Sequence, residues 1–528
     1  MPKVSPIRET TCCRTPHIDA GARTLEIDGR TLRLSDVEAA AQGARVALSA
    51  AARERVERAR TMVQDILRDR AVVYGISTGV GDLCTTIIPP DGLRTLQQNI
   101  IRSHAAGVGA ALPEPVVRAM LLLRANALAA GHSGVRAQLI DMLLALLNAR
   151  IHPIIPEQGS LGASGDLAPL AHLALVLTGE GEAVVDGARL SGRAALRRRG
   201  LAPITLEAKE GMALINGTQL MSALGAQLVL DGERLAALAD VAGALSLEAL
   251  GGTDRAFAPA LHAARPHPGQ GASAAHLRRL VAESERVAHA EYARVQDAYS
   301  LRCMPQVHGA ARQALAHLRD VLTVEINSAT DNPLLFPDTG DVVSGGNFHG
   351  QPLALPLDYV TCALAVLAGI SERRIERLVN PHLSGLPAFL APRGGLQSGY
   401  MLAQYTAAAL VSENKVLSHP ASVDSIPSSG NQEDHVSMGA AAARKARRVL
   451  EHAQQVTGIE LVVACQAVDF GRGRLGRGTA AAYRAVRDRV GRLTDDRPVG
   501  ADLTLGLALV QSGAVLDAVQ AAIGPQAG

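Results

Sequence analysis

A serine flanked by small residues stands in the segment GSLGASGDLAPL at residues 159–170. In its Ala163-Ser164-Gly165 tripeptide, the amide nitrogen of Gly165 can attack the carbonyl carbon of Ala163, because glycine has no side chain to block the approach and tolerates strained dihedral angles. Loss of water closes an imidazolone ring, and dehydration of Ser164 then leaves an exocyclic methylene conjugated to that ring. The product would be a strong electrophile made from the chain itself. The tripeptide alone is common, and in isolation it could be a plain turn before a helix that begins near Leu167.

Further motifs surround this segment in a characteristic order. They read YGISTGVG (74–81), LQQNIIRSHAAGVG (96–109), KEGMALINGTQ (209–219), VQDAYSLRCMPQ (295–306), ATDNPL (329–334), SGGNFHGQP (344–352) and SENKVLSHPASVDSIPSSGNQEDHVSMG (412–439). Together with GSLGASGDLAPL they resemble the aromatic amino acid lyases that depend on methylidene-imidazolone (MIO), and most closely the histidine ammonia-lyases among them. The resemblance extends from about residue 24 to about residue 513.

The resemblance implies the non-oxidative deamination of L-histidine to trans-urocanate and ammonia, the first step of histidine degradation. The MIO group would form autocatalytically from Ala163-Ser164-Gly165, and neither a metal nor a diffusible cofactor is expected. The β-proton of an amino acid is hardly acidic, so the reaction needs a positioned base and fixed dipoles. Tyr74 matches the family's base. Because a tyrosine with a pKa of about 10 is a poor base at neutral pH, we expect positive helix ends or cationic groups to lower its pKa.

The same motifs imply the residues that hold the amino acid. Arg302 matches the carboxylate clamp, for which a guanidinium offers a bidentate grip. Asn216, in an uncharged stretch that is predicted to be helical, is expected at the amino-carboxylate end of the substrate. Gln296 and Tyr299 are three residues apart and would face one pocket if their segment is helical. Phe348 matches a ring beside the MIO group.

Two positions bear on the choice of substrate. His104 and Glu433 match residues associated with imidazole binding, and a carboxylate can accept a hydrogen bond from either the neutral or the charged imidazole. A phenyl or phenol ring gives Glu433 little reason to be buried, whereas His104 alone does not discriminate. Ser77 and Val80 depart from the usual Tyr-Gly-Ile-Asn-Thr-Gly-Phe-Gly pattern of the family, which bears on substrate identity and leaves the chemistry intact.

Three other functions are alternatives to this one. The first is an MIO-dependent ammonia-lyase or 2,3-aminomutase for tyrosine or another aromatic amino acid, against which Glu433 argues. The second is a catalytically inactive helical scaffold, against which the intact MIO tripeptide, Tyr74 and Arg302 argue. The third is a fumarase-like lyase, but the chain lacks a Met-Pro-x-Lys-x-Asn loop and has only Met304-Pro305-Gln306.

The elements that must position these residues are mostly helical. The spacing of apolar residues predicts helices over 49–70, 114–130, 135–149, 220–250, 310–327 and 359–378. Alternating residues around Asp28-Gly29 and Asp186-Gly187 predict two short β-hairpins. The expected fold is therefore mainly α, a large helical bundle with a smaller N-terminal domain that bears the hairpins, as in the ammonia-lyase/fumarase-like architecture that the resemblance implies. The expected divisions are a flexible extension (1–23), an N-terminal domain with the MIO loop (24–215) and an elongated bundle domain (216–528).

Composition excludes several classes of protein. The chain has 528 residues, of which 48% are hydrophobic, and a net charge of +2, so it is not disordered. Balanced charge and few aromatics (7 Tyr, 5 Phe and no Trp) offer little to attract or stack nucleic acid. The first residues lack a secretory h-region, and the most apolar stretch, 211–230, is too polar for lipid. A cytoplasmic enzyme without membrane or nucleic-acid partners is expected, and the resemblance implies a homotetramer whose active sites combine loops from three subunits.

Overall fold

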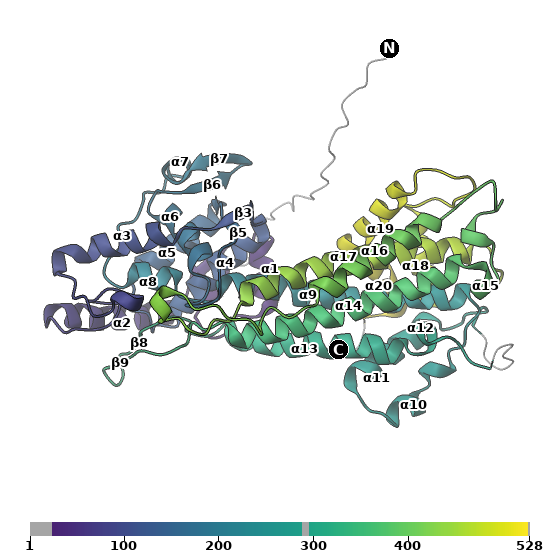
Figure 1. The fold of residues 1–528 in the computed structure, drawn as a ribbon, viewed down its shortest axis with the longest axis horizontal. Coiled ribbons are helices and arrows are strands. Elements are labelled where there is room, and N and C mark those ends of the chain that lie inside the picture. Colours follow the sequence, from purple (N-terminus) through teal and green to yellow (C-terminus); the bar gives the residue numbers. More distant parts are fainter. Residues whose placement is uncertain (1–23, 288–294, 526–528) are drawn as a thin grey trace, which may run out of the picture.

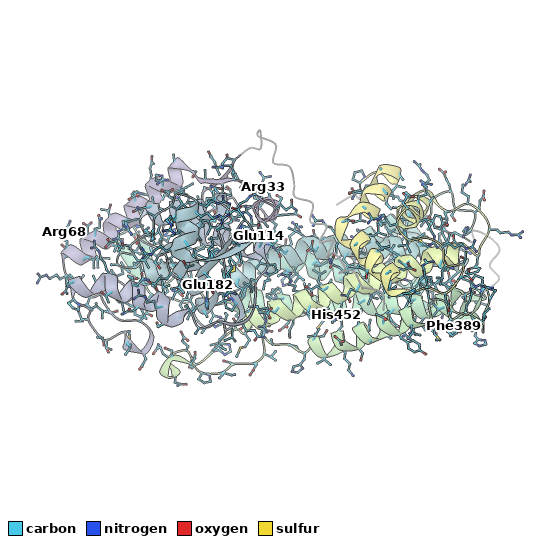
Figure 2. All side chains as sticks on the ribbon, turned by 90° about the horizontal axis from the view of Figure 1, so that it is seen from above. Arg33, Arg68, Glu114, Glu182, Phe389 and His452 are labelled. Atoms are coloured by element: carbon cyan, nitrogen blue, oxygen red, sulfur yellow. The ribbon has the colours of Figure 1, made fainter. Side chains whose placement is uncertain are left out.

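Long α-helices make up most of the computed structural model, which describes residues 24–287 and 295–525. Figure 1 shows an elongated molecule, in which a compact part with several short strands lies at one end and long helices run away from it as a bundle. Figure 2, the view from above, has Arg68 near one end and Phe389 near the other. The predicted fold class, mainly α with a large helical bundle, is confirmed.

The six helices predicted from the spacing of apolar residues are all present. The helices of the compact part are α1 (Leu34–Ala41), α2 (Ala50–Arg68), α3 (Leu93–His104), α4 (Glu114–Ala129), α5 (Ala137–Asn148), α6 (Leu167–Leu177), α7 (Gly192–Arg198) and α8 (Glu210–Ile215). The remaining helices are α9 (Gln219–Ala249), α10 (Pro259–Ala263), α11 (Pro268–Leu280), α12 (Tyr299–Arg302), α13 (Met304–Glu325), α14 (Gln351–Val379), α15 (Pro381–Ser384), α16 (Met401–Leu417), α17 (Gly439–Val468), α18 (Arg477–Arg487), α19 (Gly500–Ser512) and α20 (Ala514–Ile523). Helices α13 and α14 begin earlier than their apolar spacing predicted.

The described strands are short and form small sheets. They are β1 (Leu25–Ile27), β2 (Val46–Leu48), β3 (Val108–Ala111), β4 (His152–Pro153), β5 (Pro156–Gln158), β6 (Glu182–Val185), β7 (Ala188–Ser191), β8 (Leu334–Phe336) and β9 (Asp341–Val343). The hairpin around Asp186-Gly187 is confirmed, because β6 and β7 pair antiparallel across a turn in which both residues have positive φ, 52° and 76°.

The other predicted hairpin is wrong, because β1 pairs in parallel with β2. The Asp28 carboxylate accepts hydrogen bonds from the backbone N–H of Arg30 (2.8 Å) and of Thr31 (2.9 Å). This local turn leads the chain into α1 instead of back along β1.

The core runs through both ends of the molecule. In the bundle, α9, α13, α14 and α17 pack on one another, and α4 of the compact part packs on α9. Their buried apolar side chains belong to one cluster. The predicted division between residues 215 and 216 falls at the break between α8 and α9 and stays a prediction. The predicted extension, 1–23, lies outside the described residues.

One described helix, α14, is long and apolar enough to cross a bilayer by length and composition, and α19 with α20 could form a bent second span. Helix α14, however, packs against α9, α13, α16 and α17, and more than half of its most apolar window is buried inside the protein. These contacts are those of a core helix in the bundle.

Candidate active site

A cavity of about 1150 Å³ brings together residues from motifs that are far apart in the sequence. The predicted site residues that line it are Tyr74, His104, Ser164, Asn216, Phe348 and Glu433. They come from the loop after α2, the end of α3, the loop before α6, the α8–α9 break, the loop before α14 and the loop before α17. The cavity therefore forms where loops of the compact part meet loops of the bundle.

The Ala163-Ser164-Gly165 loop packs closely against the backbone of Gly217. Gly165 has φ +79° and forms an isolated parallel bridge with Gly217. A Cβ atom at Gly165 would lie 2.2 Å from the carbonyl oxygen of Gly217, so a larger residue does not fit there. Ala163 is buried, while Ser164 faces the cavity. These residues fit a backbone ring closed between positions 163 and 165.

A buried carboxylate anchors the far side of this loop. Asp166 Oδ2 accepts hydrogen bonds from the backbone N–H of Leu220 (2.9 Å) and of Met221 (3.0 Å), at the N-terminus of α9. Its Oδ1 accepts from the Ser160 hydroxyl at 2.9 Å, and its own backbone N–H donates to the Gly217 carbonyl oxygen at 2.6 Å. Burial raises the pKa of Asp166 to about 6. The loop is thus tied to the beginning of α9 by both backbone and side chain.

Replacing Gly165 by alanine is expected to prevent MIO formation and to destabilise the protein. The new Cβ would collide with the Gly217 backbone at a left-handed φ. The intact mass should then lack the loss of two waters, and the melting temperature should fall. Gly187→Ala is a matched control, because that glycine also has positive φ (76°) but an added Cβ would meet nothing within 4 Å. A normal two-water loss in Gly165→Ala would contradict this account of the loop.

Tyr74 lies in the cavity wall, and its hydroxyl oxygen accepts a hydrogen bond from the backbone N–H of Gly81 at 3.3 Å. Burial raises the pKa of Tyr74, and the nearby Cys84 and Glu433 raise it further, whereas the Gly81 hydrogen bond lowers it. The expectation of a lowered pKa is therefore not met within one chain. The described groups that shift this pKa include no cation.

Glu433 connects the predicted substrate pocket to the MIO loop. The Ser164 hydroxyl donates to Glu433 Oε1 at 2.9 Å, and the Ser428 hydroxyl donates to Oε2 at 2.8 Å. The backbone N–H and C=O of Glu433 also pair with those of Ser428. Both the position and the orientation of this carboxylate are consequently fixed beside the reactive serine.

His104 lies at the C-terminal end of α3, with one ring nitrogen engaged locally. Its Nδ1 lies 2.7 Å from the carbonyl oxygen of Ile100, which can only accept, so the geometry favours a proton on Nδ1. In the neutral ring Nε2 is then a hydrogen-bond acceptor. His104 and Glu433 together can thus offer two acceptors to a ligand in the cavity.

Asn216 lies outside regular helix, so the prediction of a continuous helix through this residue is wrong. It is the C-terminal cap of α8, with φ −91° and ψ 92°, and α9 begins three residues later. The prediction that the stretch is buried holds, since Asn216 is only 2% exposed. The break matters because it exposes the Asn216 side chain to the cavity and the Gly217 backbone to the MIO loop.

The remaining predicted site residues do not line this cavity in a single chain. Tyr299 and Arg302 belong to α12, which lies at the far end of the bundle from α3 and α8 (Figure 1). The Arg302 guanidinium lies over the Tyr299 ring, 4.6 Å from its centroid, and Tyr299 is 71% exposed. Gln296 precedes α12, so the helical segment expected to join Gln296 and Tyr299 is absent.

Several residues that line the cavity are not among the site residues predicted from the sequence. They include Cys84, Met212, Asn332 and Gln432. All but Cys84 stand inside motifs quoted above, and Gln432 directly precedes Glu433, so their motifs were a usable signal. Among residues 24–287 and 295–525, no group of three or more His, Cys, Asp or Glu side chains could hold a metal ion.

Comparisons with known proteins agree with this geometry. The family model for aromatic amino acid lyases matches residues 32–488. A curated relative from Symbiobacterium thermophilum, named histidine ammonia-lyase, is 56% identical over 499 residues, which cover 94% of this chain and 98% of the relative. The solved histidine ammonia-lyase of Trypanosoma cruzi is 46% identical, with a TM-score of 0.89 over 95% of this chain and 96% of its own. Tyrosine aminomutase from Streptomyces globisporus is 40% identical, with a TM-score of 0.91 over 96% and 100%.

The chain belongs to the aromatic amino acid lyase family. Within that family it is an ammonia-lyase, since eight curated relatives, 51–57% identical over nearly the full chain, all carry the name histidine ammonia-lyase.

Proposed function

We propose that this protein is a histidine ammonia-lyase, which converts L-histidine to trans-urocanate and ammonia. The observation that carries the proposal is the position of Glu433, whose carboxylate lies 2.9 Å from the Ser164 hydroxyl inside a cavity that His104 also lines. Hydrogen-bond acceptors suit an imidazole ring, which donates one N–H when neutral and two when protonated, and do not suit a phenyl ring. The histidine ammonia-lyases at 51–57% identity support the same substrate.

Each of the predicted site residues has a role in the proposed reaction. The MIO group, formed from Ala163-Ser164-Gly165, supplies an electrophile that makes the substrate amine a better leaving group. Glu433 and His104 orient the imidazole, and Phe348 lies beside the reacting centre. Tyr74 removes the β-proton. Asn216, Gln296, Tyr299 and Arg302 hold the amino-carboxylate end, with the Arg302 guanidinium gripping the carboxylate.

Glu433→Gln is expected to lower kcat/KM for histidine by about 100-fold. The amide replaces an acceptor oxygen and removes the charge, and a hydrogen bond to a charged group is worth about 1.5–3 kcal/mol. The melting temperature should change little, because among the described residues the Glu433 side chain bonds to two serine hydroxyls and its backbone pairs within its own loop. Steady-state kinetics with histidine, tyrosine and phenylalanine measure the effect. A variant that keeps full activity on histidine would contradict the assignment of the imidazole to this carboxylate.

An ammonia-lyase or 2,3-aminomutase for tyrosine is the second candidate. It is favoured by the fold, which matches tyrosine aminomutase from Streptomyces globisporus as closely as it matches any lyase named here. Glu433 argues against it, because a phenol presents one hydroxyl where an imidazole presents two nitrogens. Formation of a β-amino acid from tyrosine would favour this candidate.

The active form is proposed to be a homotetramer with shared active sites, and its location to be cytoplasmic. In one chain, Gln296, Tyr299 and Arg302 lie away from the cavity that holds the MIO loop. Exposed apolar side chains on α14 and α16 give subunits a surface to pack on. These side chains are Leu355, Tyr359, Val366, Leu402, Tyr405 and Val416.

Mixing two inactive variants is expected to restore activity. Ser164→Ala loses the electrophile and Arg302→Ala loses the carboxylate clamp, so each homotetramer should be inactive. If one site takes these residues from different subunits, hybrids made by co-expression contain some sites with both intact. Activity should therefore return to a fraction of the wild-type value, and a mixture that stays inactive would contradict shared sites.

A further inference from the structure

A buried ion pair lies directly behind the cavity wall, and nothing above uses it. Lys209 and Asp331 are both fully buried, with Lys209 Nζ 2.7 Å from Asp331 Oδ2. Lys209 has a left-handed backbone (φ 75°) just before α8, and burial lowers the pKa of its amine. Removing two charges from water is costly, so a pair without surface exposure indicates that its geometry serves something beyond stability.

The ion pair fixes the orientation of the Asn216 carboxamide. Asp331 Oδ1, the oxygen not used by Lys209, accepts from Asn216 Nδ2 at 3.3 Å and from the backbone N–H of Asn332 at 2.7 Å. Asn216 Nδ2 also donates to the carbonyl oxygen of Asn332 at 3.2 Å. Both partners of this side chain can only accept, so its NH₂ group must face them and its oxygen must face the other way.

The other side-chain atom, Asn216 Oδ1, can accept a hydrogen bond from a ligand. Among the described residues, Asn216 Oδ1 is buried and has no hydrogen-bond donor, and its residue lines the cavity beside Ser164. A buried acceptor without a donor is costly. Arg124 fixes the same segment from behind, because its NH1 donates to the Asn216 carbonyl oxygen at 3.0 Å.

We infer that Lys209 and Asp331 are positioning residues which hold Asn216 as a hydrogen-bond acceptor for the substrate's amine, and not as a donor to its carboxylate. An α-ammonium group has three N–H donors, whereas a carboxylate has none. The inference rests on the proposed function. In it, Asn216 and the Arg302 segment each recognise one part of the amino-carboxylate end of the substrate. Asn216 takes the amine, and the carboxylate is left to the Arg302 segment.

Binding of two truncated substrates tests this division without turnover. Histamine keeps the imidazole and the amine, and 3-(imidazol-4-yl)propanoate keeps the imidazole and the carboxylate. By calorimetry, Asn216→Ala should bind histamine about tenfold more weakly than the wild type. The same variant should bind the propanoate within about twofold of the wild type. The reverse pattern, with the propanoate weakened and histamine unchanged, would overturn the inference.

Asp331→Asn tests the ion pair itself. Lys209 Nζ and the Asn332 backbone N–H both donate to Asp331, and the new amide oxygen can serve only one of them. Asn216 Nδ2 then no longer faces a carboxylate, so the Asn216 carboxamide is free to turn its NH₂ toward the cavity. Histamine should again lose about tenfold in affinity, while the propanoate binds as well or better. Unchanged histamine affinity in this folded variant would overturn the role of the pair. If Asp331→Asn does not fold, the two affinities of Asn216→Ala still decide whether Asn216 contacts the amine or the carboxylate.

Two controls separate this inference from stability and from the choice of substrate. Asp469→Asn breaks another largely buried ion pair, Asp469–Arg487 (2.6 Å), whose residues do not line the cavity, and should leave both affinities unchanged. If the wild type binds neither imidazole compound but binds tyramine and 3-(4-hydroxyphenyl)propanoate, the proposed substrate is wrong. The division between amine and carboxylate is then tested with those two compounds.

Discussion

Ser164→Ala is expected to lower kcat by at least about three orders of magnitude, which corresponds to ~4 kcal/mol of activation free energy. The reason is chemical, because without the serine hydroxyl no exocyclic methylene can form and ammonia stays a poor leaving group. The fold should be unaffected, since within residues 24–287 and 295–525 the Ser164 side chain makes one hydrogen bond, to Glu433, at the edge of a cavity. Intact-mass spectrometry measures the modification directly, and kinetics measure the loss of turnover.

The control for this variant is another serine of the same cavity. Ser103 lines the cavity, and its hydroxyl donates to the Ile100 carbonyl oxygen in α3, away from the Ala163–Gly165 backbone. Ser103→Ala should keep the mass deficit of two waters, located at residues 163–165, that the wild type is expected to show. A wild-type protein with its full unmodified mass would refute the MIO assignment.

Tyr74→Phe is expected to lower kcat by about 10²–10⁴-fold, the usual contribution of general-base catalysis. The ring remains in place, and the only hydrogen bond lost among the described residues is the long one from the Gly81 backbone, so stability should hardly change. MIO should still form, which separates a defect in the base from a defect in the electrophile. A variant with normal turnover would exclude Tyr74 as the base.

The pH dependence follows from the same residue. Burial raises the pKa of Tyr74, so the active phenolate is the minor form at neutral pH and increases as the pH rises. Wild-type kcat/KM should therefore rise with pH by up to about tenfold per unit until the pH reaches that pKa. Tyr74→Phe should lose this rise. A lower pKa in the assembled enzyme would require a cation from a neighbouring subunit, and Arg302 is the candidate that the proposed assembly supplies.

Much of the fold could be predicted because local patterns agree with it. Ser49 illustrates this at the start of α2, where its side chain accepts a hydrogen bond from Ala52 N–H, as an N-cap residue should. The hairpin at Asp28-Gly29 failed because the aspartate bonds to its own turn, while Asp186-Gly187 adopts the two positive φ values that a tight hairpin requires. The two dipeptides are identical, so the residues around them distinguish the turns, for example Thr31, whose hydroxyl also donates to Asp28 at 3.1 Å.

The sequence predicted many of the residues that line the site but not how they are arranged in space. The break at Asn216 has a signal in Asn216-Gly217, a dipeptide typical of turns, but the orientation of the Asn216 side chain depends on distant partners such as Asp331. In the proposed tetramer, Arg302 would reach the cavity of a neighbouring subunit, and no spacing within one chain reveals such an arrangement. The few aromatic residues map the site only in part, since Tyr74 and Phe348 line the cavity whereas Tyr400 is buried elsewhere and donates to Asp502 at 3.0 Å.

Incubation of the purified protein with L-histidine, L-tyrosine and L-phenylalanine in separate reactions tests the central claim most directly. The product to follow is the unsaturated acid that each amino acid would yield. The account predicts release of trans-urocanate from histidine, with little or no coumarate or cinnamate from the other two. Release of coumarate or cinnamate without urocanate would contradict it.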